Sequence, residues 1–333
     1  RPGLLFAGSE RRVYVSLDAG EHWFSVQNNL PLTPVHDLVF KNGDVVVATH
    51  GRSFWVLDDM TPLRQATSLK AEAPFLFRPR ESFRPGGIAF SYYLPKDADK
   101  VALEVFDEEG VVVSRRSGVL ETGAGLQRQS ASLSYPGFRG FPGMVLWGAG
   151  GRSIPAPPGR YTIRLTVDGK TLTETIRYRV NPNSTSSEAD AKAQATFARR
   201  VAARTQEAND AVVAIRSIKK KVAELKKGDA KIDVAAQTLV DRLSGIEGEI
   251  YQVRNQSGQD PLNYPVKLNN RLGALLGEIL SGDFRPNDQS YVVFAKLSDL
   301  LQVQLDALSK VLKEDLGSLN TLLKGRGIEA IAP

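Results

Sequence analysis

The sequence contains no cysteine, and it has only three histidines, two methionines and three tryptophans in 333 residues. Without cysteine the chain forms no disulfide, no thiolate metal site and no cysteine nucleophile. The histidines, His22, His36 and His50, all lie near the start of the chain, so histidine-based chemistry is confined to that region. Neither His22 nor His36 has a carboxylate at the spacing of a zinc site, and we therefore expect no metal and no cofactor.

Long apolar runs and a strong excess of one charge are also missing. No run reaches the ~18 apolar residues that a membrane-spanning helix needs. The 43 basic residues are nearly matched by 37 acidic ones, so the composition does not indicate a nucleic-acid partner. The basic run Lys219–Lys221 lies close to Glu224, which is typical of a solvated helix face. A chain of this length is expected to contain two or three domains.

Residues 1–65 are expected to form short antiparallel strands. Short connections join the apolar runs LLFAGS, RVYVSL, HWFSV, VHDLVF, DVVVATH and SFWVLDD. Asn42-Gly43, between the fourth and fifth of these runs, is a strong signal for a two-residue hairpin turn. A meander of this kind is typical of propeller blades or of a barrel.

Residues 66–85 are expected to be a linker, because prolines punctuate them and favour an extended, fairly stiff path. Residues 86–182 are expected to form a small β-sandwich of the immunoglobulin or fibronectin type, since short apolar runs alternate there with turn signals. MVLWG (144–148) is one of the predicted strands, and Trp147 is its expected core anchor.

Residues 187–325 are expected to form an antiparallel helical bundle. Residues 183–188 supply helix caps and an acidic first turn. Apolar residues then recur at three- and four-residue steps in four successive stripes, which include Phe197, Ile232, Leu268 and Phe294. Because each stripe needs a facing partner, four helices should pack against one another. The predicted fold class is multidomain, β followed by α.

The stretch SLDAGEHW, residues 16–23, has the spacing of a β-hairpin turn. Asp18 can accept hydrogen bonds from the amides that follow it, and Ser16 adds a second short polar side chain. Gly20 can adopt a positive φ, and Trp23 can pack its ring over the turn. The spacing predicts a folding device, with no nucleophile, base or metal ligand.

SLDAGEHW resembles the Asp box of bacterial neuraminidase-repeat (BNR) propellers, a group that includes sialidases and sortilin-type domains. ATHGRSFWVLDDMTPLRQ (48–65) resembles the end of the last blade in large sortilin-like bacterial proteins, often labelled glycosyl hydrolase. SYYLPKDADKVALEVFDEEGVVV and APPGRYTIRLTVDGKTLT resemble parts of the immunoglobulin-like domain that follows such a propeller. YQVRNQSGQDPLNYPVKLNNRLGALLG (251–277) resembles the helical tail, so the resemblance runs through the whole chain in order.

This resemblance implies that most of a propeller and an export signal precede residue 1, and that the protein is periplasmic, on the outer surface or secreted. The rest of the propeller, other proteins or further copies of the chain are the implied partners. The implied function is a non-catalytic interaction region or scaffold of a cell-envelope or extracellular assembly. Two alternatives stay open: the end of a glycoside hydrolase of the sialidase or xyloglucanase type, with its carboxylates mainly upstream, and a sortilin-like peptide-binding propeller.

Asp58-Asp59 is the most catalytic-looking pair in the chain. Glycoside hydrolysis uses two carboxylates that face each other, whereas adjacent residues of a strand point to opposite faces. We therefore expect a strand end with turn-capping side chains. His50, Arg52 and Asp58 are candidates to line a propeller mouth, although His50-Gly51-Arg52 has the chemistry of a tight turn.

A polar, amide-rich loop is expected between the second and third helices. Its candidate interaction residues are Asn255, Gln256, Gln259, Asp260, Asn263 and Tyr264. Such a cluster can hold a tight connection between helices through side-chain bonds to the backbone, or it can form a recognition surface. The structural interpretation is favoured.

Overall fold

The computed structural model describes residues 2–226 and 228–332. Strands occupy the first part of the chain and helices the C-terminal part, which confirms the predicted order of β followed by α. The chain divides into two compact units. The first extends to Leu133 and resumes over Pro158–Asn181, and the second comprises Ser134–Pro157 and the residues from Pro182 onward. Residues 134–157, expected within the sandwich, thus belong to the helical unit.

Two antiparallel three-stranded sheets begin the first unit. They consist of β1 (Leu5–Gly8), β2 (Val13–Ser16) and β3 (Phe24–Ser25), and of β4 (Val35–Lys41), β5 (Asp44–Thr49) and β6 (Phe54–Leu57). Asn42 and Gly43 join β4 to β5 with φ angles of 52° and 90°, which confirms the predicted hairpin. Val13, Val45, Val47 and Met60 form a small buried cluster between the two sheets.

The segment expected to be a linker contributes strands to the larger sheets of the first unit. It follows α1 (Thr61–Gln65) and begins with the 3-10 turn η1 (Ala66–Ser68). Within it, β7 (Phe75–Leu76) pairs with β9 (Ile88–Leu94), and β8 (Ser82–Arg84) pairs in parallel with β16 (Lys170–Val180). Leu76, Phe77 and Arg84 are buried. The alternation of apolar and basic residues here is therefore that of strands, not of an extended path over a surface.

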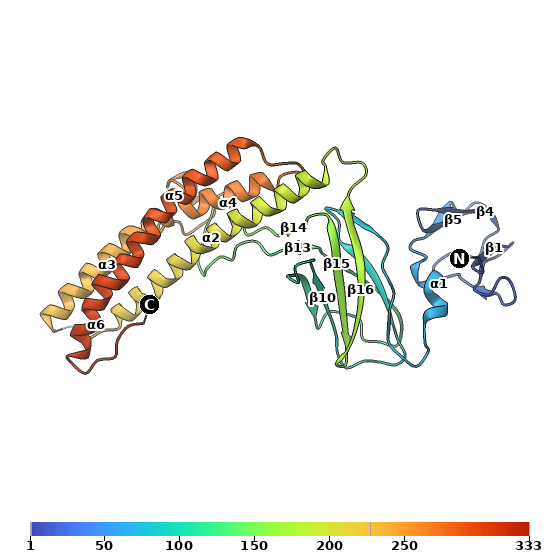
Figure 1. Ribbon diagram of the computed structural model, residues 1–333, viewed down its shortest axis with the longest axis horizontal. Helices are drawn as coiled ribbons and strands as arrows, with labels where there is room; N and C mark the ends of the chain where they lie inside the picture. The colour runs from blue at the N-terminus through green and yellow to red at the C-terminus, as the bar shows by residue number, and fades with distance from the viewer. Residues whose placement is uncertain (1, 227, 333) are drawn as a thin grey trace. The chain divides into compact units, whose positions relative to one another are not determined.

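The two larger sheets have the strand orders β11-β10-β15-β16-β8 and β12-β9-β7. Their remaining strands are β10 (Val101–Phe106), β11 (Val112–Ser117), β12 (Gly125–Ala131) and β15 (Gly159–Val167). In Figure 1, β10, β15 and β16 lie side by side, as their antiparallel pairing requires. Alternate side chains of β10 and β15 are buried, so each strand turns one face to a core.

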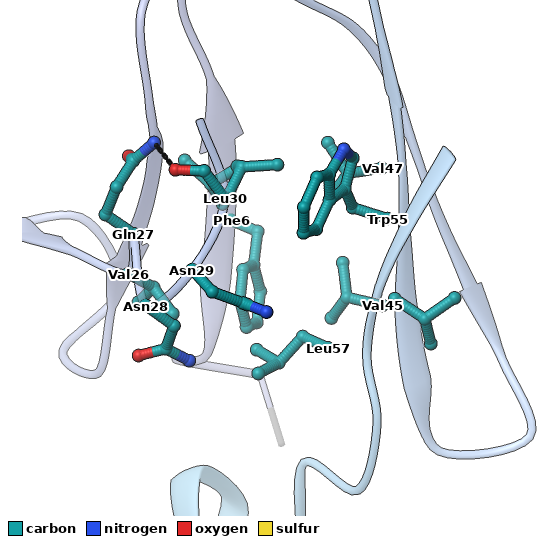
Figure 2. A pocket seen from close by; sticks show the side chains of 12 residues that line it. Phe6, Val26, Gln27, Asn28, Asn29, Leu30, Val45, Val47, Trp55 and Leu57 are labelled. Atoms are coloured by element: carbon teal, nitrogen blue, oxygen red, sulfur yellow. Dashed lines mark hydrogen bonds between the residues drawn. The ribbon is translucent and has the colours of Figure 1, made fainter. Parts of the chain in front are cut away.

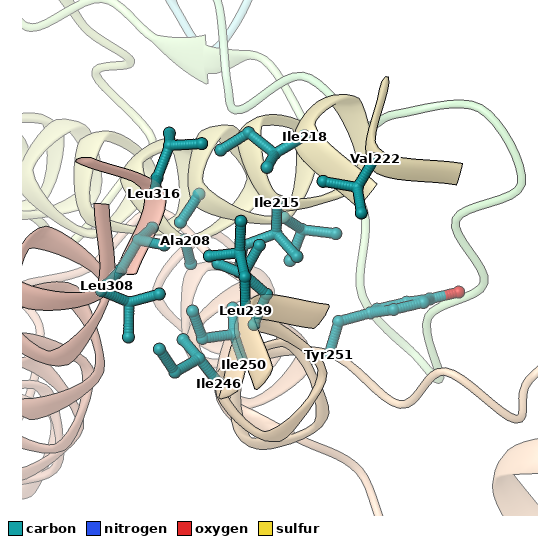
Figure 3. Close-up of a cluster of buried hydrophobic side chains, with 14 of the residues drawn as sticks. Ala208, Ile215, Ile218, Val222, Leu239, Ile246, Ile250, Tyr251, Leu308 and Leu316 are labelled. Carbon is teal, nitrogen blue, oxygen red and sulfur yellow. The ribbon is translucent and has the colours of Figure 1, made fainter. Parts of the chain in front are cut away.

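The second unit contains the four predicted helices. They are α2 (Glu188–Ala223), α3 (Ala230–Ile250), α4 (Leu268–Ile279) and α5 (Asp288–Val311), and α5 continues through the π-helical turn η3 (Leu312–Leu316) into α6 (Gly317–Lys324). Ser187 and Asp190 form a capping box at α2, and Asp229 caps α3. The helices lie side by side (Figure 1) around one aliphatic core (Figure 3). In residues 2–226 and 228–332, no helix combines the length and the apolar character that crossing a membrane requires.

Residues 134–157 form an arm that packs on the helices. Its ends pair as the short strands β13 (Ser134–Tyr135) and β14 (Ile154–Pro155). Residues 144–148 form no strand, and Trp147 is 45% exposed. The predictions of a strand there and of Trp147 as a core anchor are therefore wrong. Gly143 and Gly148 have positive φ and interrupt an extended path. The Trp147 amide and carbonyl bond to the side chain of Asn270 on α4 instead of to a neighbouring strand.

Candidate functional site

The SLDAGEHW turn is held by Ser16 and Asp18. The hydroxyl of Ser16, at the buried end of β2, donates to Asp18 Oδ1 over 2.8 Å and accepts from the Gly20 amide over 2.8 Å. Gly20 has a φ of 104°, and a Cβ at that position would lie 4.0 Å from the ring of Trp23. Ser16, Asp18, Gly20 and Trp23 thus meet in one turn, in which the hydroxyl of Ser16 is directed at the carboxylate and not at a histidine.

Asp18 also binds His22. Its Oδ1 accepts the His22 amide over 3.0 Å, and its Oδ2 lies 2.7 Å from His22 Nδ1. The backbone N–H of His22, and then the His22 ring and the Ser16 hydroxyl, lower the pKa of Asp18 from 3.8 to about 2. The contact between Asp18 and His22 was not predicted from the sequence. Even so, no three His, Asp or Glu side chains among residues 2–226 and 228–332 are grouped to hold a metal ion.

His50 and Arg52 belong to the turn between β5 and β6. The His50 carbonyl accepts from the hydroxyl of Thr33, and its ring stacks on His36 at 5.1 Å between centroids. The carbonyl of Arg52 accepts the indole N–H of Trp55 over 2.8 Å. Asp58 lies beyond the other end of β6, and six residues of extended chain span roughly 20 Å. The structure thus places Asp58 apart from His50 and Arg52.

The paired aspartates follow β6 and have separate partners. Arg128 on β12 binds Asp58 with both terminal nitrogens, at 2.8 and 2.5 Å, and its hydrogen bonds lower the pKa of Asp58. Asp59 has a φ of 60° and accepts the amide of Thr61, the first residue of α1. Asp44 accepts both the Asp59 amide and Arg80 Nη1 at 2.8 Å. Each of these carboxylates is thus bonded to a backbone amide or to an arginine, and all three contribute to the electrostatic environment of Arg128.

In the loop after α3, some of the predicted side chains are bonded within the protein and others are exposed to solvent. Asp260 accepts the amides of Gln256 and Ser257 over 2.6 and 2.8 Å, and these bonds lower its pKa. Asn255 is buried, and its Nδ2 lies 3.4 Å from the Val145 carbonyl of the arm. Tyr264 lies under the Arg254 guanidinium, 5.5 Å from ring centroid to carbon. The side chains of Gln256, Gln259 and Asn263 are exposed.

One feature of the first sheets has no counterpart in the predicted site residues. In the register of β4, β5 and β6, Val39, Val46 and Val56 lie across from one another, and Ala48 lies across from Phe54. We call these five residues the outer face of β4–β6, because Val45 and Val47 point into the buried cluster on the other side. Phe54 is 74% exposed, and Val39 and Val56 are each more than half exposed.

The opposite faces of these sheets meet around a small cavity. Phe6 of β1, Val45 and Val47 of β5, and Trp55 and Leu57 of β6 point toward one another there (Figure 2). The cavity has a volume of about 50 Å³, well below the ~300 Å³ of the smallest typical ligand pockets. This cavity is therefore a gap in the core between the sheets, too small for a typical ligand.

Sequence reasoning also missed a charged cluster between α2 and α3. Glu247, 3% exposed, accepts from Arg216 Nε over 2.6 Å and from Lys219 Nζ over 3.0 Å. The basic run Lys219–Lys221 had predicted a solvated helix face. Lys219 instead donates to a buried carboxylate. The partners are 28 and 31 residues apart in sequence, and no spacing rule for a single helix connects them.

Comparisons with known proteins add little. No protein-family model matches the chain, and no curated protein matches it. One solved structure, titled "pT26-6p", aligns with 70% of this chain at 13% identity and a TM-score of 0.16. The chain spans about half of that structure, 49% of its length. At this TM-score the alignment carries no argument about fold or function.

Proposed function

We propose that this chain is a non-catalytic C-terminal region of a β-propeller protein that acts outside the cytoplasm as a protein-binding scaffold. In this proposal β1–β6 end the propeller, the two larger sheets form an immunoglobulin-like sandwich, and α2–α6 form an accessory bundle. The assignment of family and location rests on the resemblance of SLDAGEHW and the later motifs. The observation that carries the interaction role is the outer face of β4–β6.

The five residues of the outer face of β4–β6 are all apolar, and the exposed Asp37, which lies across from Ala48, is a charged neighbour on the same face. An antiparallel sheet with one face in water alternates apolar and polar residues. Here Val45 and Val47 on one face are matched by Val46, Val56 and Phe54 on the other. Burying apolar surface is favourable by about 25 cal/mol per Å², and contiguous exposed patches mark interaction sites. Blades of a propeller stack around a common axis, so a neighbouring β-sheet is a fitting partner.

The carboxylates support a non-catalytic role. Asp18 binds the turn amides, Asp58 binds Arg128, and Asp44 binds Arg80. A retaining or inverting glycosidase needs two carboxyl groups facing each other about 5–10 Å apart across the substrate. Since these carboxylates hold turns and arginines, we favour the scaffold over the glycoside hydrolase.

Site-specific photo-crosslinking in the producing cell tests the interaction role. A photoreactive phenylalanine analogue at position 54 is expected to crosslink to a β-propeller blade, identified by mass spectrometry of the joined peptides. The matched control is position 234 on α3, because Val234 is also strongly exposed but lies outside the outer face. Equal crosslinking at positions 54 and 234, or none at either, would count against the proposal.

Hydrolysis assays test the non-catalytic part separately. The purified chain is expected to release no product from aryl sialosides or xyloglucan oligosaccharides. Turnover that disappears in Asp58→Asn or Asp18→Asn would instead establish the glycoside hydrolase alternative.

A further inference from the structure

A hollow of about 520 Å³ opens beside α2 and α3. Arg216, Lys219, Ser244, Glu247 and Val253 line it. Arg216 and Lys219 are three residues apart on α2, and Ser244 and Glu247 are three residues apart on α3. Side chains at that spacing share one helix face, so four polar groups converge from two rigid helices. Its volume lies within the ~300–1,000 Å³ typical of sites for small ligands.

The hollow has an excess of one positive charge. Glu247 is its acidic group, and both Arg216 Nε and Lys219 Nζ donate to it. Either Arg216 or Lys219 alone would neutralise the charge of Glu247. With both present, the lining of the hollow carries one uncompensated positive charge, and Ser244 adds a hydroxyl to the same lining.

Arg216 is held in place by aromatic rings as well as by Glu247. Its guanidinium carbon lies 4.9 Å from the centroid of Phe141 and 5.2 Å from that of Tyr251. Figure 3 shows Tyr251 at the edge of the aliphatic core, with its hydroxyl directed away from it. That hydroxyl accepts the Val145 amide over 3.0 Å and donates to the Gly143 carbonyl over 3.2 Å. The guanidinium therefore contacts one ring that belongs to the arm, Phe141, and one that is hydrogen-bonded to the arm, Tyr251.

The bonds of Arg216 leave its terminal nitrogens available. Glu247 takes the Nε–H, and within residues 2–226 and 228–332 neither Nη group has a hydrogen-bond acceptor. A guanidinium presents paired donors in one plane, which match two oxygens of a carboxylate or phosphate. Lys219 retains two further N–H groups after its bond to Glu247.

We propose that this hollow binds the oxyanion group, a carboxylate or a phosphate, of a small ligand. The Arg216 Nη groups bind two of its oxygens, and Lys219 and Ser244 supply further donors. Glu247 acts as a positioning residue, because it holds both cations and does not touch the ligand. Val253, half exposed at the rim, packs against an apolar portion of the ligand. This site is independent of the outer face of β4–β6.

Isothermal titration calorimetry of the whole chain tests the site with sodium phosphate, acetate and butyrate. Sodium chloride at the same ionic strength controls for screening of surface charge. Lys219→Met is expected to weaken oxyanion binding about tenfold or more, as for a lost hydrogen bond to a charged group. The matched control is Lys220→Met, which removes the same charge from the adjacent exposed position and should change the affinity by less than about twofold.

The three probes separate the two ligand classes. A higher affinity for phosphate than for acetate and butyrate indicates a phosphate ligand. A higher affinity for butyrate than for acetate indicates a carboxylate with an apolar tail. Each methylene that Val253 buries is expected to raise the affinity up to about fourfold, and Val253→Ser should remove that gain.

Two results would overturn the proposal. One is the absence of saturable binding by any of the three anions, which would leave the charged cluster as a structural link between α2 and α3. The other is an equal loss of binding in Lys219→Met and Lys220→Met. Circular dichroism shows that each variant is folded, and Arg216→Lys, which keeps the charge but loses the paired donors, should weaken carboxylate binding without unfolding the helices.

Discussion

The sheets β1–β6 and the helices α2–α6 bury their apolar residues in different ways. Between the small sheets the buried cluster consists of Val13, Val45, Val47 and Met60, and it borders a cavity. In the helical unit one continuous core runs from Phe141 of the arm to Ile331 and includes residues of α2, α3, α4, α5 and α6. The outer face of β4–β6, by contrast, remains exposed to solvent.

This difference shows where each region obtains its stability. The helices bury the apolar residues of their stripes against one another, and their exposed apolar residues include Val234, Val292 and Val303. Most of the stability of the helices is therefore internal to the unit. The sheet β4–β6 buries Val45 and Val47 on one face and leaves Val39, Phe54 and Val56 exposed on the other. Part of its stabilisation therefore depends on what covers the exposed face. Substitutions in the two cores should therefore have unequal costs.

The largest expected effect is the loss of a fully buried leucine from the helical core. Leu272→Ala should lower the free energy of unfolding by about 2–5 kcal/mol, because the helices around it cannot collapse into the cavity. Val47→Ala in the small cluster should cost only about 1–3 kcal/mol. Urea denaturation followed by circular dichroism at 222 nm reports the helices. Tryptophan fluorescence in a Trp147→Phe background reports Trp23 and Trp55 of the first unit.

The helical core is expected to lose more unfolding free energy in Leu272→Ala than the small cluster loses in Val47→Ala. A cost below about 1 kcal/mol for Leu272→Ala would show that the helical core is loosely packed. A larger cost for Val47→Ala than for Leu272→Ala would show that the small sheets are the better-packed region.

A smaller effect is expected in the arm, which the helical unit holds tightly. A Cβ at Gly151 would overlap the carbonyl oxygen of Phe138, whereas a Cβ at Gly150 would meet no atom within 4 Å. Gly151→Ala should therefore cost about 1–3 kcal/mol through displaced backbone. Gly150→Ala is the matched control and should be close to neutral in the same urea denaturation. Equal effects of the two substitutions would show that the arm adapts freely.

The sequence predicted the features that depend on local spacing. The stripes that include Val212, Ile215, Leu243 and Leu301 are buried, because a helical period places such residues on one face. The Asn42-Gly43 hairpin formed because that pair accepts positive φ at both central positions.

The missed features depend on partners that are distant in sequence. Trp147 is held by Asn270, 123 residues away, so an apolar run that reads as a strand is instead bonded to a helix side chain. Lys219 reads as a solvated lysine because Glu224 is near it in sequence, but its partner in space is Glu247. The terminal nitrogens of Arg216 gain their role only from the rings and carboxylate assembled around them.

A third prediction concerns the ion pair between Arg128 and Asp58 in the first unit. Arg128→Gln should cost no more than about 1 kcal/mol, because both Arg128 and Asp58 are roughly half exposed and water screens the pair. The pKa of Asp58 is lower when folded than its ordinary value of 3.8, so the pair stabilises the fold above that pH. The stabilisation is lost as the pH falls through the folded pKa.

Denaturation at several pH values measures this contribution. Wild type and Arg128→Gln should differ near pH 7 and converge below pH 3.8. A double-mutant cycle with Asp58→Asn isolates the pair from other effects of either substitution. A difference that persists unchanged in acid would show that Arg128 acts through its packing and not through the carboxylate.

The smallest expected effect is a change of ionisation in the exposed Asp18 turn. Carboxyl resonances followed by NMR should give Asp18 a pKa of about 2, and its contribution to stability should be lost as the pH falls from 3.8 toward that value. His22→Ala removes the ring but keeps the backbone N–H, which is the main cause of the shift, so the pKa should rise only partly. Ser16→Ala removes the hydroxyl bonds to Asp18 and Gly20 and should also raise it. A pKa near 3.8 in the unsubstituted chain would show that the turn between β2 and β3 does not hold its carboxylate in solution.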